Sequence, residues 1–371
     1  MRTTMQRPLE GVLVADFTTL LPGPLATLML AEAGADVIKI ERPGGEDVRR
    51  FPPFLNGRSA SFAVLNRGKK SLVADLKNEK DKAAVWALVE RADVLVEQFR
   101  PGVMERLGFG YDAVRAQNPK IVYCSISGYG QAGPRRTEAG HDINYIGATG
   151  LLSLAPGPVD RPTVPPGLIA DIGGGTMPAV TNILLALLGR QKSGQGTHID
   201  IAMADAMFTF AWYALATYHT TGRNPGPGEL RHNGGSARYQ LYPTSDGKIV
   251  ACGALEQHFW LSFTTAIGLP EALVNDERDA QATAETVRKI IASKPAEHWQ
   301  PIFAKADCCV TIMATLEQAL RDPHFIERGL FAYQVALPGG GTMPALPVPI
   351  APQFRGEAKA VAAPSLAEKK T

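Results

Sequence analysis

Cysteine is scarce in this chain, and its spacing fits neither a disulfide framework nor a metal site. The four cysteines are Cys124, Cys252 and the adjacent pair Cys308 and Cys309. A chain with so few cysteines is typical of a reducing compartment, which predicts a cytoplasmic protein. The seven histidines are scattered and form no HExxH or zinc-finger spacing, so we expect no metal.

An excess of charge of one sign is also lacking. The chain has 38 lysines and arginines against 36 aspartates and glutamates, a formal net charge of +2. This near balance provides no surface for coating a polyanion, so we expect no nucleic-acid partner. Any anionic ligand must then be held by local clusters of basic residues.

Apolar runs of membrane-spanning length are lacking too. Asp16 interrupts the only early apolar stretch, so the sequence predicts no signal peptide. Residues 201–218 are the most membrane-like stretch, but they include Asp205 and lie between polar segments. We therefore expect a buried or subunit-contacting helix there and no membrane partner.

What the chain does have is alternating strand and helix patterns. Residues 11–17 predict a buried strand, residues 25–33 a helix after a Pro-Gly turn at 21–24, and residues 35–41 a second strand. Further strands are predicted at 71–76, 93–99, 121–127 and 197–201, and further helices at 79–92 with Asn78 as N-cap, 176–190 and 205–221. Strand–helix–strand units predict an α/β fold with a parallel sheet. The first loop lacks GxGxxG, so the pattern does not support a nicotinamide dinucleotide site.

A break in composition divides the chain into two domains, as its length of 371 residues favours. Residues 222–235 are rich in glycine, proline and asparagine, and residues 239–252 then alternate as in a β-hairpin. Helical patterns near 259–266 and 284–293 follow, and the chain is expected to rejoin the large domain near 306–312. We predict a large domain of residues 1–222 and 310–371, with a frayed tail beyond Phe354, and a small α+β domain of residues 223–309.

Basic residues recur at the ends of the early predicted strands. They are Arg42, Arg49, Arg50, Arg67, Lys69, Lys70, Arg100 and Arg106. Ligands of open α/β sheets bind outside the carboxyl ends of the strands, and guanidinium groups grip phosphates through paired donors. This recurrence indicates a phosphate-bearing ligand, although a solvated basic rim explains any single residue equally well.

Two groups that can carry a proton lie at the ends of residues 140–175. His141 follows Gly140, Asp171 precedes a run of three glycines, and residues 155–167 between them are too rich in proline and glycine for regular structure. Singly, His141 reads as a core histidine and Asp171 as a helix N-cap. Together they favour a proton-handling site. Glu256, after the hairpin, is either an exposed carboxylate or a partner that orients His141.

Several longer motifs carry a family resemblance. They are IERPGG, FRPGVMERLGFG, AGHDINY, ADIGGG and DPHFIERG. Over residues 9–355 the chain resembles the family III CoA-transferase superfamily of CaiB/BaiF type, and within it the α-methylacyl-CoA racemase branch. The resemblance implies a Rossmann-like large domain and a smaller α+β domain. It also implies an interlocked homodimer, with active sites between the large domain of one subunit and the small domain of the other.

The resemblance also assigns residues. His141 and Asp171 match the two proton-transfer residues of the racemases, and Glu256 matches the glutamate that hydrogen-bonds the histidine. The residues that match contacts to CoA or substrate are Arg42, Ala74, Asp75, Leu76, Lys77, Gln98, Phe99, Arg100, Arg106, Gly140, Asp142, Ile143, Asn144 and Tyr145. The substrate implied is an acyl-CoA thioester of lipid metabolism, with no separate cofactor.

Three activities follow from these assignments. The first is inversion of the α-carbon of a 2-methylacyl-CoA by proton transfer through an enolate. The second is CoA transfer between carboxylic acids through an anhydride on Asp171, and the third is CoA binding without catalysis. The chain departs from the racemase pattern at Gln257 and His258, where a proline is usual, and at Ala237 and Arg238. Arg238 and His258 therefore predict a different acyl pocket, and the acyl group stays open.

Overall fold

A computed structural model describes residues 7–157 and 160–366. The chain divides into two compact units, which are described separately. The large unit combines both chain ends, up to Thr149 and from Pro323, with Pro165–Thr209. The small unit consists of Gly150–Val164 and Phe210–Asp322, whereas the sequence placed its boundaries at 222 and 310.

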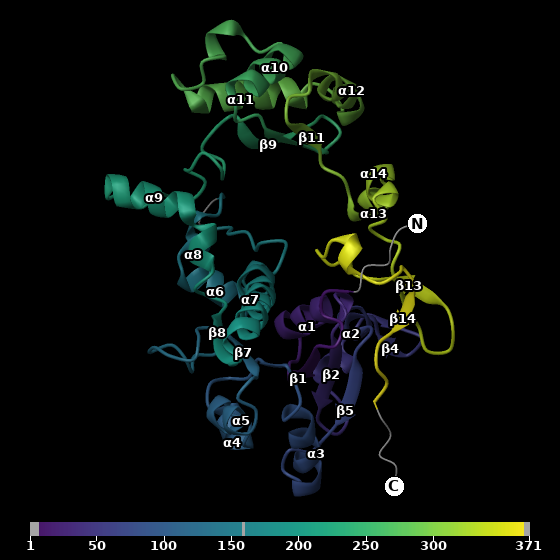
Figure 1. The fold of residues 1–371 in the computed structure, drawn as a ribbon. Helices are drawn as coiled ribbons and strands as arrows, with labels where there is room; N and C mark the ends of the chain where they lie inside the picture. Colours follow the sequence, from purple (N-terminus) through teal and green to yellow (C-terminus); the bar gives the residue numbers. More distant parts are fainter. Residues whose placement is uncertain (1–6, 158–159, 367–371) are drawn as a thin grey trace. The chain divides into compact units, whose positions relative to one another are not determined.

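The large unit contains a six-stranded parallel sheet, as the strand–helix pattern predicted (Figure 1). Across the sheet its strands are β5 (Lys70–Val73), β2 (Asp36–Glu41), β1 (Leu13–Asp16), β6 (Val94–Glu97), β7 (Val122–Ser127) and β8 (Thr197–Ala202). Numbered along the chain, this is the 3-2-1-4-5-6 order of a Rossmann fold. The order reverses between β1 and β6, so the carboxyl ends of these two strands define the expected ligand crevice.

Helices cover both faces of this sheet. On one face, α1 (Pro22–Glu32) packs on β1, β2 and β6, and α7 (Met177–Ser193) packs on β7 and β8. On the other face, α3 (Glu79–Val89), α4 (Val103–Leu107) and α5 (Tyr111–Gln117) bury a core that includes Phe17, Leu95 and Phe109. Asn78 caps α3 as predicted, since its side chain accepts from the N–H groups of Lys80 and Asp81.

Several helices differ from the sequence prediction, and the following examples bear on the site. α1 begins at Pro22, inside the predicted turn, because proline at a first helical position needs no N–H acceptor. The predicted helix at 205–221 is split into α8 (Met207–Phe210) and α9 (Trp212–Thr221), with Ala211 in a non-helical conformation. No residue of α9 is buried. A helix that the sequence did not predict, α6 (Asp142–Ala148), begins directly after His141.

Among the described residues, one helical run is long and apolar enough, by length and composition, to cross a membrane. It is Ala170–Ser193, with a mean hydropathy of 1.4, and not residues 201–218. Its buried side chains, among them Val180, Ile183 and Leu187, lie on the face that packs on β7 and β8. That is the position of a core helix of an α/β unit.

The small unit has a three-stranded antiparallel sheet with helices on one side (Figure 1). The predicted hairpin is confirmed as β9 (Tyr239–Pro243) and β10 (Ile249–Gly253). β11 (Val310–Ile312) pairs with β10, although the sequence placed the return to the large domain there. α10 (Gln257–Ile267), α11 (Ala280–Ala292) and α12 (Ala296–Ala306) bury Tyr242, Val250 and Trp260 against the sheet.

Shorter elements complete the large unit and the end of the small one. They are α2 (Ala60–Asn66), α13 (Leu316–Leu320), α14 (Pro323–Glu327), the β-hairpin of β3 (Phe54–Leu55) and β4 (Arg58–Ser59), and the sheet of β13 (Thr342–Pro344), β12 (Gln334–Ala336) and β14 (Ala360–Ala362). The pairing of β14 with β12 corrects the prediction that the tail frays directly after Phe354.

Candidate active site

The loops that leave β1 and β6 are tied together at the crevice where the strand order reverses. The backbone N–H of Gly23 donates to Gln98 Oε1 at 2.8 Å. A Cβ atom at Gly23 would lie 2.4 Å from Thr18 and 2.5 Å from the same Gln98 oxygen, so only glycine fits. Gln98 therefore fixes the start of α1 against the end of β6.

Asp171 lies inside a π-helical turn, Ala170–Thr176, directly before α7. It is thus not the N-cap that the sequence offered as the alternative. The glycines after it allow close packing: a Cβ at Gly174 would lie 2.4 Å from the Met203 carbonyl oxygen. At Gly175 it would lie 3.1 Å from both Pro22 and Met203. The glycine run therefore holds Asp171 against β8 and the start of α1.

The buried carboxylate of Asp142 joins this turn to α6. Its Oδ1 accepts a hydrogen bond from the backbone N–H of Asp171 at 2.9 Å. His141 precedes Asp142 in an extended conformation, is exposed, and donates its backbone N–H to Asn144 Oδ1 at 3.0 Å. The structure thus brings together His141 and Asp171, which lie 30 positions apart in the sequence.

The electrostatics around Asp171 favour proton exchange near neutral pH. Burial, followed by the negative charge of Asp142, raises the pKa of Asp171 to about 6, and His141 opposes this rise. A carboxyl group with such a pKa is present in both protonation states in a neutral solution. A carboxyl group with a raised pKa is suited to act as an acid in one direction and as a base in the other.

Tyr145 is a buried residue of α6 that packs against the residues before the helix. Its hydroxyl donates to the Gly140 carbonyl oxygen at 2.6 Å, and its ring meets Tyr129 edge-on at 5.3 Å. A Cβ at Gly128 or Gly140 would lie about 2.5 or 2.6 Å from the ring. Burial and the charge of Asp171 raise the pKa of Tyr145 to about 12, so it stays a neutral hydrogen-bond donor.

Comparison with known protein families identifies the family of this chain. The family model described as CoA-transferase family III matches residues 9–370. The chain belongs to CoA-transferase family III.

Curated relatives of this family III protein include both transferases and racemases. It is 35% identical to the acetyl-CoA:oxalate CoA-transferase of Acetobacter aceti, over 92% of this chain and 89% of that protein. It is 34% identical to the α-methylacyl-CoA racemase of Homo sapiens, over 87% of this chain and 82% of that protein. Since both identities are alike, the comparison establishes acyl-CoA chemistry without separating the two reactions.

Solved structures share the fold along nearly the whole chain. A variant of Rv3272 from Mycobacterium tuberculosis matches with a TM-score of 0.81 at 28% identity, covering 96% of this chain and 95% of that one. A CaiB/BaiF family protein from Brucella suis matches with a TM-score of 0.77 at 31% identity, covering 96% and 94%.

The residues predicted to bind CoA fall into two groups in the family III chain. Arg42, Lys77, Arg100 and Arg106 are exposed, whereas Ala74 is buried in the core and Leu76 and Phe99 pack against it. Arg42 Nη2 donates to Asp47 Oδ1 at 2.5 Å beyond the end of β2. Asp75 accepts from the Lys77 N–H at 3.0 Å, and Ile143 and Asn144 are exposed in α6. The exposed members are therefore accessible to a ligand, whereas Ala74 is not.

Several basic residues of the predicted phosphate cluster are already paired inside the protein. Arg49 binds both oxygens of Glu41, at 2.8 and 2.6 Å, and Arg67 Nε lies 2.8 Å from Glu32. Lys69 is buried, with its Nζ 3.2 Å from Asp16 Oδ2. The sequence missed these pairs because their carboxylates lie 8 to 53 positions away. For these three basic residues the phosphate prediction is wrong, and they hold the large unit together.

The small unit carries Glu256, so its relation to His141 stays a prediction. Glu256 is exposed and precedes the first residue of α10. Arg238 forms an ion pair with Asp276 at 2.7 Å and lies over the Trp260 ring, and its place in an acyl pocket stays a prediction. His258 is exposed beside the Phe259 ring.

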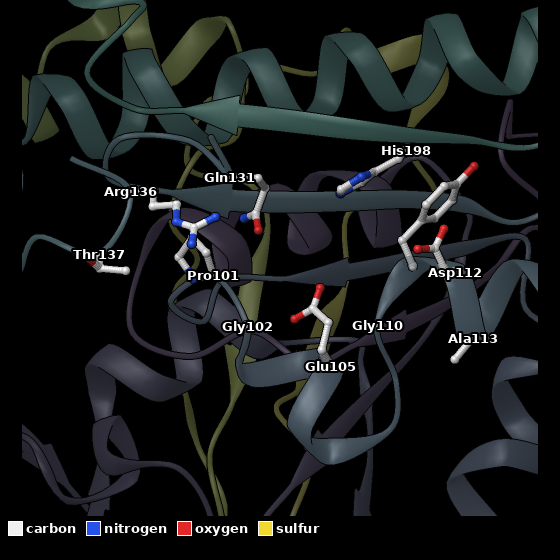
Figure 2. Close-up of a pocket in the computed structure, with 11 residues that line it drawn as sticks. Pro101, Gly102, Glu105, Gly110, Asp112, Ala113, Gln131, Arg136, Thr137 and His198 are labelled. Atoms are coloured by element: carbon white, nitrogen blue, oxygen red, sulfur yellow. The ribbon is translucent and has the colours of Figure 1, made fainter. Parts of the chain in front are cut away.

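A separate cavity of about 680 Å³ lies between α4, the loop after β7, and β8. Figure 2 shows Glu105, Gln131 and His198 pointing into it from these three elements. None of the residues assigned to catalysis or CoA binding lines it. The His198 ring contacts Ser125 Oγ at 2.9 Å and stacks on Tyr111, so it has partners of its own.

Proposed function

We propose that this family III protein inverts the configuration of the α-carbon of a 2-methylacyl-CoA thioester. The observation that carries the proposal is the paired placement of His141 and Asp171, joined through Asp142, with the Asp171 pKa raised to about 6. His141 supplies an imidazole, which commonly serves as a catalytic acid or base. A racemase needs two such groups, because each must act as base in one direction and as acid in the other.

The reaction would begin with removal of the α-proton by His141 from one face of the substrate. The electron pair of the broken C–H bond passes to the thioester carbonyl, forming an enolate. Asp171, as the carboxylic acid, then returns a proton to the opposite face. The N–H groups of Asp142 and Ile143, in the first turn of α6, are the expected donors to the enolate oxygen.

CoA transfer is the alternative. The 35% identity to an oxalate CoA-transferase supports it, and a carboxylate of raised pKa is a better nucleophile than an ordinary one. In this reaction Asp171 would attack the thioester carbonyl, CoA would leave as thiolate, and an acceptor carboxylate would open the anhydride. His141 has no role in that sequence, which is why we favour the racemase.

A homodimer forms part of the proposal. Large apolar side chains are exposed on α7, among them Leu185 (61%) and Leu188 (56%), and Trp212 of α9 is 63% exposed. Apolar surface of this extent favours a partner, and a second copy would bring Glu256 of its small unit to His141. Sedimentation at micromolar concentration should show a dimer. A monomer with full activity would contradict this part of the proposal.

The deciding experiment is incubation with one enantiomer of a 2-methylacyl-CoA in deuterium oxide, with and without added carboxylic acids. Deuterium at the α-carbon together with the opposite enantiomer supports the racemase. His141→Ala and Asp171→Asn should each lower the exchange rate by ~100-fold or more. As a control, Asp36→Asn should leave the exchange rate unchanged, because Asp36 begins β2 and lies at the amino ends of the strands. Transfer of CoA to the added acid without α-exchange would overturn the proposal in favour of a transferase.

A further inference from the structure

The small unit carries an apolar cavity to which the catalytic assignments give no role. Its volume is about 490 Å³, within the range of small-molecule sites. Leu241, Ala251 and Thr311 are register partners on β9, β10 and β11 and form its floor. Because strand side chains alternate, this floor faces away from the core that buries Tyr242 and Val250 under the helices.

The cavity is lined mainly by apolar and neutral side chains. Among the described residues that line it there is no lysine, arginine or histidine. The Asn233 amide donates to the Leu154 carbonyl at 2.8 Å, and the Gln240 amide donates to the Gly234 carbonyl at 2.6 Å. Asn233 Oδ1 is buried without a hydrogen-bond partner among the described residues. A carboxylate placed there would meet an oxygen acceptor and apolar walls, which is costly.

Two arginines near the end of β10 donate to a backbone carbonyl and do not line the cavity. Arg231 and Arg238 both donate to the Leu255 carbonyl oxygen, at 2.7 and 3.3 Å, and Arg238 is also paired with Asp276. A dicarboxylic acyl group would need such a cation for its second carboxylate. The described part of this cavity supplies none.

The cavity is also close to Glu256. Gly253 lines it and ends β10, three positions before Glu256. Cys309, at the cavity, is near enough that the Glu256 charge, after burial, raises the pKa of its thiol. A ligand in the cavity would thus lie beside the carboxylate that is assigned to the active site.

We propose that this cavity holds the acyl chain of the CoA thioester, and that this chain is uncharged rather than a dicarboxylic half-thioester. The inference rests on the proposed function, since it takes the substrate to be an acyl-CoA that reacts beside Glu256. The acyl specificity of this protein would then differ from that of the relatives whose names specify oxalate or glutarate.

The first test uses Cys309 as a reporter, because it is exposed whereas the other three cysteines are buried. The rate of alkylation by iodoacetamide is followed by peptide mass analysis on the full-length protein. Hexanoyl-CoA should slow alkylation of Cys309 about fivefold or more, whereas CoA and adipoyl-CoA should not. Equal rates with saturating hexanoyl-CoA would overturn the inference. A second result would also overturn the inference: a Cys309 that is unreactive without ligand and becomes reactive when the subunits dissociate. A second copy of the chain would then fill the cavity.

The second test fills the cavity. Ala251→Leu should weaken hexanoyl-CoA binding about tenfold, corresponding to about 1.4 kcal/mol, and leave the Kd for CoA unchanged. The matched control is Ala304→Leu, on an exposed position of α12, which should change neither. Binding is measured by calorimetry, so turnover is not required. Protection of Cys309 without α-exchange would contradict the racemase alone, whereas α-exchange with neither effect would contradict the cavity assignment alone.

Discussion

The Asp142 carboxylate accepts a hydrogen bond from the backbone N–H of Asp171, with 2.9 Å between Oδ1 and N. This contact joins the first turn of α6 to the π-helical turn before α7. It also places one negative charge beside another, and that charge, after burial, raises the pKa of Asp171 to about 6. Asp142 therefore both positions and tunes the group that we assign to proton return.

Replacing Asp142 by asparagine should lower the pKa of Asp171. The amide oxygen still accepts the hydrogen bond, but the neighbouring negative charge is gone, so the carboxylate form of Asp171 becomes easier to form. Where Asp171 acts as base, activity should begin at lower pH. In the direction in which Asp171 acts as the acid, activity falls as the pH rises, and this fall should begin at a lower pH than in the wild type. The pH profiles of α-deuterium exchange from each enantiomer measure both shifts.

Asp142→Ala separates the two roles of this residue. It removes the acceptor as well as the charge, and a buried N–H without a partner costs about 1–3 kcal/mol. We expect a lower free energy of unfolding in urea for Asp142→Ala than for Asp142→Asn. A pH profile of Asp142→Asn that is unchanged, or shifted to higher pH, would contradict the tuning role.

Arg106 is predicted to bind a phosphate of CoA, and its exposed side chain lies on α4. Arg106→Gln should raise the Kd for CoA by about tenfold or more, because a charge-assisted hydrogen bond contributes about 1.5–3 kcal/mol. The matched control is Arg115→Gln on α5, which is equally exposed. Calorimetric titration at two salt concentrations measures both. Equal Kd values for the two variants would remove Arg106 from the CoA site.

The parallel sheet could be predicted from the sequence because its buried strands are short apolar runs bounded by turn residues. β2 and β7 illustrate this, since they lie within a residue of the predicted ranges. The N-cap of α3 at Asn78 could be predicted from the sequence in the same way. These features depend on neighbours in sequence, and hydrophobic periodicity reports such neighbours directly.

The contacts that shape the site could not be predicted in this way. The bond between Asp142 and Asp171 spans 29 positions, and the contact between Lys69 and Asp16 spans 53. The sequence pattern of a basic residue beside a strand is the same whether the side chain binds a phosphate or a buried carboxylate. Packing decides between them, and packing depends on the whole fold.

Lys69 and Asp16 form a buried pair that should dominate the stability of the crevice. Burial lowers the pKa of Lys69 to about 8 although Asp16 opposes this shift. Lys69→Met would leave the Asp16 carboxylate buried without its nearest cation, which costs about 3–5 kcal/mol. Chemical denaturation at fixed protein concentration measures the loss.

Lys70→Met is the matched control for this prediction. Lys70 is the next residue, and it pairs with Asp36 at 2.8 Å where both side chains are about half exposed or more. An exposed pair contributes about 1 kcal/mol at most. Losses of similar size for the two variants would contradict the view that the buried pair stabilises the crevice.

Gly174 should tolerate no side chain, because the Met203 carbonyl oxygen lies 2.4 Å from the position of its Cβ. Gly174→Ala must displace the π-helical turn from β8, and with it Asp171. We expect a loss of about 1–3 kcal/mol in unfolding free energy and an exchange rate lower by about 100-fold. Gly189→Ala, in the interior of α7, meets nothing within 4 Å and should stabilise the protein by up to ~1 kcal/mol. Neither glycine has a left-handed backbone in the described chain, so the two variants differ in space rather than in backbone strain. If both variants kept full activity and stability, the close packing of the glycine run would not be what positions Asp171.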